Sequence, residues 1–172
     1  MDMTGIRHTA ENLRPRTPHF EFYKPARMHD NLPNRMSLDI LFCAVPKLDL
    51  SCPMLGISLL SATVKRDGFK SHVLDLNADF GSRFQQFFPD LSWAELEPIF
   101  TEPDLFALHK SQFDLLAENW STRILSHAPK YVGFSAFTQR NRLMIKLLCG
   151  KLRQKDRNVK LLVGGADCSD TI

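Results

Sequence analysis

The sequence predicts an α/β domain with a doubly wound parallel sheet, and three observations support this. Short, mostly apolar runs with the length of buried strands recur along the chain, at 38–45, 71–76, 131–137 and 159–163. Segments with helical spacing of apolar residues separate these runs. Two glycines follow the last run directly. Because parallel strands need crossover connections, this alternation favours a parallel sheet.

The first strand–helix–strand unit spans 38–76. Its first strand ends at Pro46, and a helix follows from about Met54 to Arg66. Gly68 is placed where a glycine commonly ends a helix. We expect this helix to bury one side, made of Leu55, Leu59, Ala62 and Thr63.

Residues 77–129 are predicted to form a helical insert after the second strand. Ser92 and Glu95 have the spacing of a capping box, and Pro103 is suited to open a longer helix that ends near Ser126. Its expected apolar face is Leu105, Leu108, Leu115, Leu116 and Ile124. The segment is rich in Phe and Trp, for which we favour packing over the alternative that some of them wall a large planar ligand.

The second half of the sheet comes from 131–163. Thr138 is suited to cap a helix that runs to about Lys155, and the fourth strand ends in Gly164-Gly165. The expected apolar face of this helix is Leu143, Ile145, Leu147, Leu148 and Leu152. The elements predict a three-layer domain of Rossmann-like or flavodoxin-like type, which is incomplete because no fifth strand follows. Its last strand would then be an exposed edge through which copies self-associate.

Residues 1–36 differ in composition from 37–172. Prolines and arginines are spread through them without helical or strand spacing, so we expect a flexible basic leader before a single domain. The arginines form no dense block, and the net charge of the chain is only +3. We therefore expect no nucleic-acid partner.

The cysteines and the apolar runs place further limits on function. Cys43, Cys52, Cys149 and Cys168 are scattered, without the spacing of a zinc site or a disulfide framework, which favours a reducing, cytoplasmic setting. No apolar run has the length of about 20 residues that spans a membrane. We therefore expect no membrane partner.

Three loops leave the carboxyl ends of the predicted strands, at 46–53, 135–138 and 164–169. In open α/β sheets, ligands bind outside these ends. Ser135 and Thr138 place hydroxyl groups there, and Gly164-Gly165 would let the backbone approach a ligand closely. Taken alone, each feature is more often a helix cap or a turn, but together they predict a binding edge.

A sequence resemblance supports this edge. Residues 53–62 read PMLGISLLSA, residues 65–69 read KRDGF and residues 73–77 read VLDLN; the third strand contributes VGFS and the fourth VGG with Asp167. Their order and spacing resemble the N-terminal cobalamin-binding domain of cobalamin-dependent radical SAM enzymes over about 37–170. The Gly-Gly-Pro-His-like ending of that family's fourth strand appears here as Gly164-Gly165-Ala166-Asp167.

The resemblance implies a cofactor and a site. Cobalamin (vitamin B12) would lie across the strand ends and serve methyl or alkyl transfer by a separate radical SAM domain or subunit. The matching positions are Cys52, Pro53, Leu55, Ser135, Phe137, Thr138, Gly164, Gly165 and Ala166. The chain lacks the Asp-x-His-x-x-Gly motif of other cobalamin domains, so the resemblance implies cobalt without a protein histidine ligand. It also lacks CxxxCxxC, so we expect no iron–sulfur cluster and no catalysis by this chain alone.

Other functions stay open. The domain would be a vestigial or partner-dependent interaction domain if it binds no cofactor. A phosphoacceptor receiver needs acids after the first and third strands, where Ala44-Val45 and Ser135-Ala136 stand. A flavodoxin-like domain needs a phosphate loop after the first strand, and this loop is missing here. A self-contained enzyme with a thiol nucleophile needs a base beside the thiol, and neither Cys52 nor Cys168 has a histidine nearby in sequence.

Overall fold

The computed structural model describes residues 37–46, 49–51 and 54–168. The expected leader at 1–36 lies outside these residues, and so do Cys52 and Pro53.

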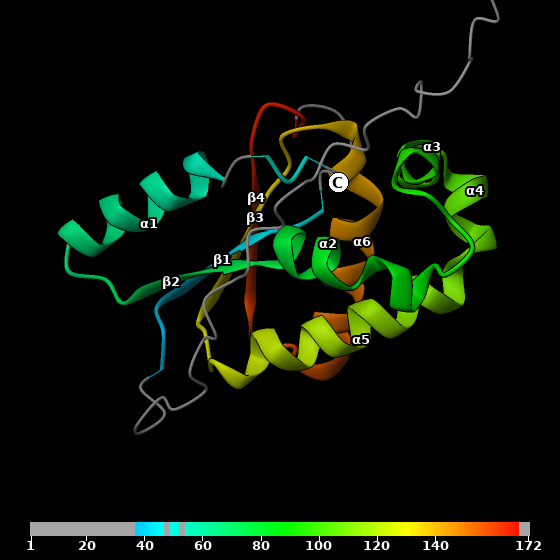
Figure 1. Cartoon of the computed structure of the whole chain (residues 1–172). Coiled ribbons are helices and arrows are strands. Elements are labelled where there is room, and N and C mark those ends of the chain that lie inside the picture. Colours follow the sequence, from blue (N-terminus) through cyan, green and yellow to red (C-terminus); the bar gives the residue numbers. More distant parts are fainter. Residues whose placement is uncertain (1–36, 47–48, 52–53, 169–172) are drawn as a thin grey trace, which may run out of the picture.

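Four parallel strands form one sheet in the order β2-β1-β3-β4. They are β1 (Ile40–Ala44), β2 (Ser71–Asp75), β3 (Tyr131–Ser135) and β4 (Lys160–Gly164). Ile40 is level with Ser71 of β2 and with Tyr131 of β3, so the strands begin in one row and end at one edge. Figure 1 shows helices on both sides of this sheet. The predicted fold class, a doubly wound α/β domain of Rossmann-like type, is confirmed.

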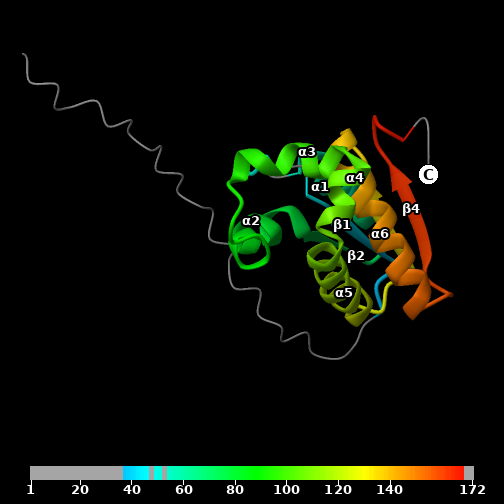
Figure 2. The same ribbon diagram turned by 90° about the vertical axis from the view of Figure 1, so that its right-hand side faces the viewer.

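The helices are divided unequally between the two faces of the sheet. They are α1 (Leu55–Arg66), α2 (Leu76–Phe87), the short 3₁₀ helix η1 (Trp93–Glu95), α3 (Leu96–Thr101), α4 (Pro103–Leu108), α5 (Lys110–Ser126) and α6 (Gln139–Lys155). Helix α1 packs on one face, where Ile57 contacts Phe42 and Ala44 of β1. Helices α2, α3, α5 and α6 pack on the other, and β4 stands at the outer edge beside α6 (Figure 2).

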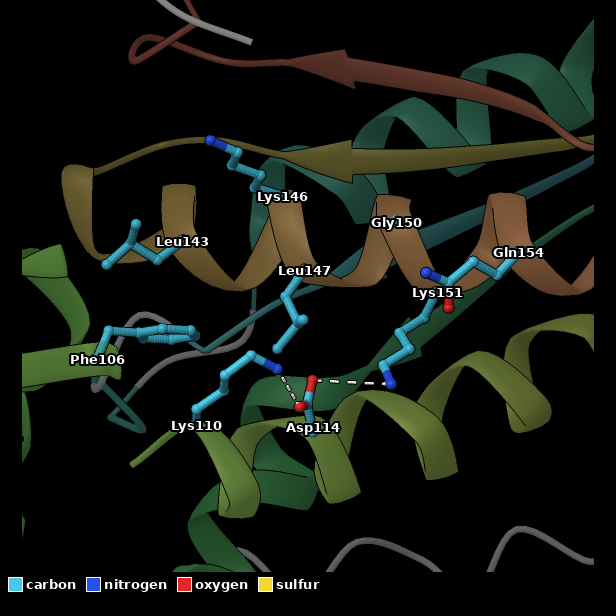
Figure 3. A pocket seen from close by; sticks show the side chains of 9 residues that line it. All are labelled: Phe106, Lys110, Asp114, Leu143, Lys146, Leu147, Gly150, Lys151 and Gln154. Carbon is cyan, nitrogen blue, oxygen red and sulfur yellow. Dashed lines mark hydrogen bonds and ion pairs between the residues drawn. The ribbon is translucent and has the colours of Figure 1, made fainter. Parts of the chain in front are cut away.

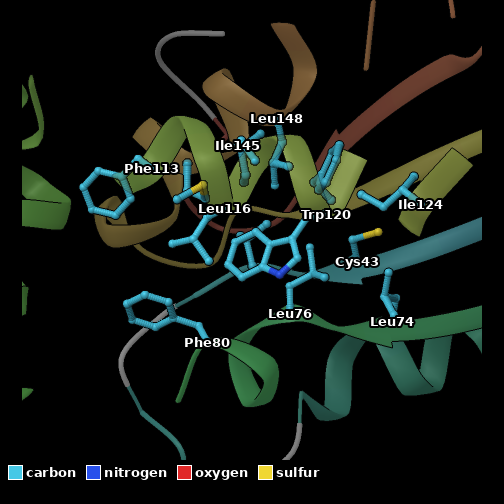
Figure 4. Packing of buried hydrophobic residues seen from close by; sticks show 14 of the residues in the cluster. Cys43, Leu74, Leu76, Phe80, Phe113, Leu116, Trp120, Ile124, Ile145 and Leu148 are labelled. Atoms are coloured by element: carbon cyan, nitrogen blue, oxygen red, sulfur yellow. The ribbon is translucent and has the colours of Figure 1, made fainter. Parts of the chain in front are cut away.

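The main core lies between the sheet and the helices that follow β2 and β3 (Figure 4). Aromatic residues of the insert supply much of it, and Phe80, Phe100, Phe113 and Trp120 are all 1% exposed or less. The Phe80 ring meets the rings of Phe100 and Trp120 edge-on, at 5.4 and 6.5 Å between centroids. These aromatics therefore pack the core, as we expected.

One carboxylate joins α2 to α5 beside this core. Asp79 accepts hydrogen bonds from Trp120 Nε1 at 2.7 Å and from Arg123 at 3.3 Å, and it pairs with Arg83 on its own helix. The buried indole N–H is thereby satisfied. This cluster fixes how α5 lies against the start of α2.

The buried side of α1 differs from the prediction. Leu55, Leu59 and Ala62 are exposed, whereas Ile57 and Ser61 are buried against the sheet. The Ser61 and Ser71 hydroxyls share a hydrogen bond of 2.9 Å, which ties this side of α1 to β2. Contacts with β1 and β2 thus set the rotation of the helix, and its leucines are left in solvent.

The predicted helix from Pro103 to Ser126 is in fact two helices. Helix α4 ends at Leu108, and His109 lies between it and α5. The His109 N–H donates to Phe106 O, while its carbonyl accepts from Phe113 N, so it caps both helices. Leu108 and Leu115, expected on the apolar face, are 77% and 54% exposed. By contrast, the capping box of Ser92 and Glu95 is confirmed.

We expect two histidines to make the stability of the fold depend on pH. His72 is half-buried and its ring stacks on His127, with 5.6 Å between the ring centroids. Burial, followed by the charges of His127, Lys65 and Arg123, lowers the pKa of His72 below its usual 6.5. The unfolded chain therefore takes up this proton more readily than the folded chain. The contribution of neutral His72 to the free energy of unfolding is therefore fully present above about pH 6.5, and it is lost as the pH drops below that value.

We expect the free energy of unfolding, measured in urea, to decrease between about pH 7.5 and about pH 5.5, on either side of the ordinary histidine pKa. His72→Gln should flatten this slope because it removes the titrating ring. An equal slope in the His72→Gln variant would assign the effect to another group.

Candidate functional site

The candidate site is the edge of the sheet at which β1, β3 and β4 end. Strands β1 and β3 are neighbours, but the chain leaves β1 toward β2 on one side and leaves β3 toward β4 on the other. The loops after β1 and β3 therefore diverge. This is the topological switch point, where open α/β sheets bind ligands.

Asn141, in the first turn of α6, joins the two diverging loops. The side chain is fully buried. Its Nδ2 donates to Pro46 O at 2.8 Å and to Val45 O at 3.4 Å, in the loop after β1. Its Oδ1 accepts from the backbone N–H groups of Phe137 and Thr138, both at 3.1 Å, in the loop after β3. One amide thus satisfies backbone groups on both sides of the switch point.

The loop after β1 is also anchored on α2. Asn77, buried in the first turn of that helix, donates from Nδ2 to Asp49 O at 2.9 Å. Asp75, the last residue of β2, caps the same helix by accepting from Ala78 N at 2.8 Å. The described part of this loop therefore has fixed attachments on α2 and α6.

The loops after β3 and β4 bind each other through their backbones. Ala136 N donates to Gly164 O at 2.7 Å, and Asp167 N donates to Ala136 O at 3.0 Å. Gly165 lies between these bonds with a φ of +128°. A Cβ atom on Gly165 would stand 2.5 Å from Ala136 O, so only glycine allows this approach.

An ion pair holds the loop after β4 on α6. Arg142 donates from Nε to Asp167 Oδ2 at 2.6 Å and from its terminal nitrogen to Oδ1 at 2.7 Å. The Asp167 side chain is only 16% exposed. Because both bonds of this bidentate pair are short and partly shielded from water, it fixes the loop more firmly than a surface pair would.

The structure brings most of the predicted site residues together. The joined loops carry Ser135, Phe137, Thr138, Gly164, Gly165 and Ala166. Ser135 is half-buried, Ala166 is exposed and the Phe137 ring is 62% exposed. Thr138 caps α6, as predicted, in a capping box with Asn141. Leu55 opens α1 and is 79% exposed, so it adds nothing to the core of the edge.

Sequence reasoning missed the side-chain contacts that hold the edge together. It did not single out Asn141 or Arg142, and it did not predict that Asp167 pairs with Arg142. A signal for Asn141 was present, since it stands three residues after Thr138 at the spacing of a capping box. Its bonds to Val45 and Pro46 span more than 90 residues of chain and leave no local pattern.

The described edge offers groups that form hydrogen bonds and apolar contacts. It presents backbone groups, hydroxyls and one exposed aromatic ring. Cys43 is fully buried, and burial raises the pKa of its thiol, which stays protonated at neutral pH. His72 and His127 lie at the opposite end of the strands, beside the start of β2 and β3. Within the described ranges, no group of three or more His, Cys, Asp or Glu side chains could hold a metal ion.

The fold defines the chain as an α/β domain of Rossmann-like type. Comparisons with models of known protein families, with curated proteins and with solved structures found no match. In the described part of the chain, no helix is both long enough and apolar enough to cross a bilayer.

Proposed function

We propose that this chain is a cobalamin-binding module that serves methyl or alkyl transfer by a separate radical SAM domain or subunit. The observation that carries the proposal is the joining of the loops after β1, β3 and β4 into one edge by Asn141 and by the bonds around Gly165. A preformed edge of this kind lowers the cost of ordering loops around a ligand.

The residues at the edge fit the periphery of a corrin ring. Its amide substituents need hydrogen-bond partners and its faces need apolar contacts, which Ser135 and the exposed ring of Phe137 offer. Gly164 has no atom of the described chain within 4 Å of its missing Cβ, so a bulky group has room to approach. Bound cobalamin would supply the transferable alkyl group, while the protein would hold and orient it. We place the module in the cytoplasm, where the free thiols of Cys43, Cys149 and Cys168 suit a reducing setting.

The test is retention of cobalamin by the purified chain. We expect protein incubated with hydroxocobalamin and then desalted to keep about one cobalamin per chain, read from its visible spectrum. Phe137→Ala should reduce retention by about tenfold or more, because it removes the exposed ring at the edge. The matched control is Phe69→Ala, which removes a ring of similar exposure (55%) next to β2.

A second candidate has its own observation. If the folded chain retains no cobalamin, it is better described as an interaction domain that needs a partner. Parallel sheets are normally covered on both faces. Here α1 packs on β1 and β2, while Leu162 of β4, on the same face, is 47% exposed. The exposed leucines of α1, Leu55, Leu59 and Leu60, lie on this side of the domain too.

A further inference from the structure

A hollow of about 430 Å³ lies on the outer surface of α6, where α4 and α5 face it (Figure 3). This volume lies within the range of about 300–1,000 Å³ that is usual for small-molecule sites. We propose that the hollow binds a small organic anion with an apolar body, such as an aromatic carboxylate. It is formed by the middle of α6, whereas the strand-end edge uses the first turn of that helix.

The apolar wall of the hollow is formed in advance. Phe106, Leu143 and Leu147 line it. The Phe106 ring stacks on Phe113 with 4.1 Å between centroids and an angle of 3° between their planes, and Phe113 is fully buried. The ring is therefore held in place without a ligand. Leu143 and Leu147 were expected in the core, but they are half-buried and leave apolar surface for a ligand.

Three lysines surround this wall. Lys110, Lys146 and Lys151 line the hollow together with one acid, Asp114. Asp114 pairs with Lys110 and, at 3.7 Å, with Lys151. The hydrogen bond from Lys110 lowers the pKa of Asp114, which therefore stays charged. With Asp114 charged, the lining still has two positive charges in excess. These favour an anion over a neutral or cationic ligand.

The lysines differ in how far they are already engaged. Lys151 also lies 3.9 Å from Glu118, and Glu118 in turn pairs with Lys155 at 2.6 Å. Lys146 is exposed, and Figure 3 shows its ammonium group on the side of α6 away from Lys110 and Asp114. We therefore assign the main contact with the anionic group to Lys110, whose ammonium group faces Leu147 across the hollow (Figure 3), with Lys146 and Lys151 adding positive charge nearby.

Gly150 supplies an independent observation. It lies inside α6, where glycine costs about 1 kcal/mol relative to alanine. A Cβ atom at this position would meet no atom of the described chain within 4 Å, so internal packing does not require glycine. Gly150 lines the hollow, and it leaves the helix backbone open to close approach by a ligand. A bound ring lying across α6 would give this glycine a role.

The probe is 2-naphthoate, followed by its shifts of backbone amide signals in ¹⁵N-labelled full-length chain. We expect the shifted signals to cluster at 147–154 and 106–114. The neutral analogue 2-naphthalenemethanol should bind at least about tenfold more weakly than 2-naphthoate, since it lacks the charge. Shifts centred on α1 or on the strand ends would overturn the proposal.

Two variants and a control make the test specific. Gly150→Phe should fill the hollow and remove binding, and Lys110→Gln should weaken it by about tenfold or more. The control is Lys160→Gln, which removes an exposed charge on β4 outside the hollow and should change nothing. If Gly150→Phe does not fold, Lys110→Gln alone decides. Equal affinity in the Lys110 variant and the unchanged chain would contradict the site. Hydroxocobalamin retention, measured on the same variants, should be unaffected. Failure of the anion site on α6 can therefore be distinguished from failure of the proposed cobalamin site at the strand ends.

Discussion

Replacement of Asn141 by leucine should lower the free energy of unfolding by about 2–4 kcal/mol, because it leaves buried backbone groups without partners. Leucine has the same branched arrangement of side-chain heavy atoms as asparagine and is somewhat larger, so no cavity forms and the loss comes mainly from hydrogen bonding. The carbonyl of Pro46 loses a donor at 2.8 Å, and the N–H groups of Phe137 and Thr138 lose their acceptor at 3.1 Å. The measurement is urea unfolding followed by circular dichroism.

The control for this prediction is Asn119→Leu on α5, where the asparagine is exposed. We expect a change within about 0.5 kcal/mol there. The Asn141 variant should also speed hydrogen exchange at the amides of 136–138, since these loops lose their common attachment. A variant as stable as the unchanged chain would mean that Asn141 does not join the loops.

The element order was predictable because it depends on local patterns. Each strand is a short apolar run, and Thr138 starts α6 by a cap that acts over three residues. The α1 rotation was not predictable in this way. Leu55 and Leu59 have ideal helical spacing, yet they face solvent because the Ser61–Ser71 hydrogen bond and the packing of Ile57 turn the other side to the sheet.

The break at His109 shows the same limit. No glycine or proline marks it in the sequence, and the periodic pattern continues through it. The break is instead associated with packing, since Phe106 at the end of α4 stacks on Phe113 in the first turn of α5. The contact between Phe106 and Phe113 joins two helices. The periodicity of apolar residues along one helix carries no information about such a tertiary contact, so it cannot predict the break.

The candidate edge was predictable in position but not in its supports. Strand ends meet at one edge of any parallel sheet, so Ser135 and Gly164 could be placed there from the pattern alone. The side chains that fix the loops act over long separations: Asn141 reaches back to Pro46, and Arg142 reaches forward to Asp167. Such pairs depend on the folded arrangement of three strands.

Gly165→Ala is expected to destabilise the domain by about 3 kcal/mol, through backbone strain and a steric clash. A φ of +128° is poorly accessible to any residue with a Cβ atom. The new methyl group would also stand 2.5 Å from Ala136 O, a backbone atom that accepts the bond from Asp167 N. Relief of this contact requires the loops after β3 and β4 to separate.

The adjacent Gly164→Ala provides the matched control. A Cβ atom on Gly164 would meet nothing within 4 Å, so we expect a change within about 0.5 kcal/mol. Both variants add one methyl group to neighbouring positions of one turn, and they differ in backbone conformation and in the contact with Ala136. Thermal and urea unfolding of the pair therefore isolates the close approach of the two loops. Equal stability of the two variants would show that the edge is not held by this contact, and the binding proposal would lose its structural basis.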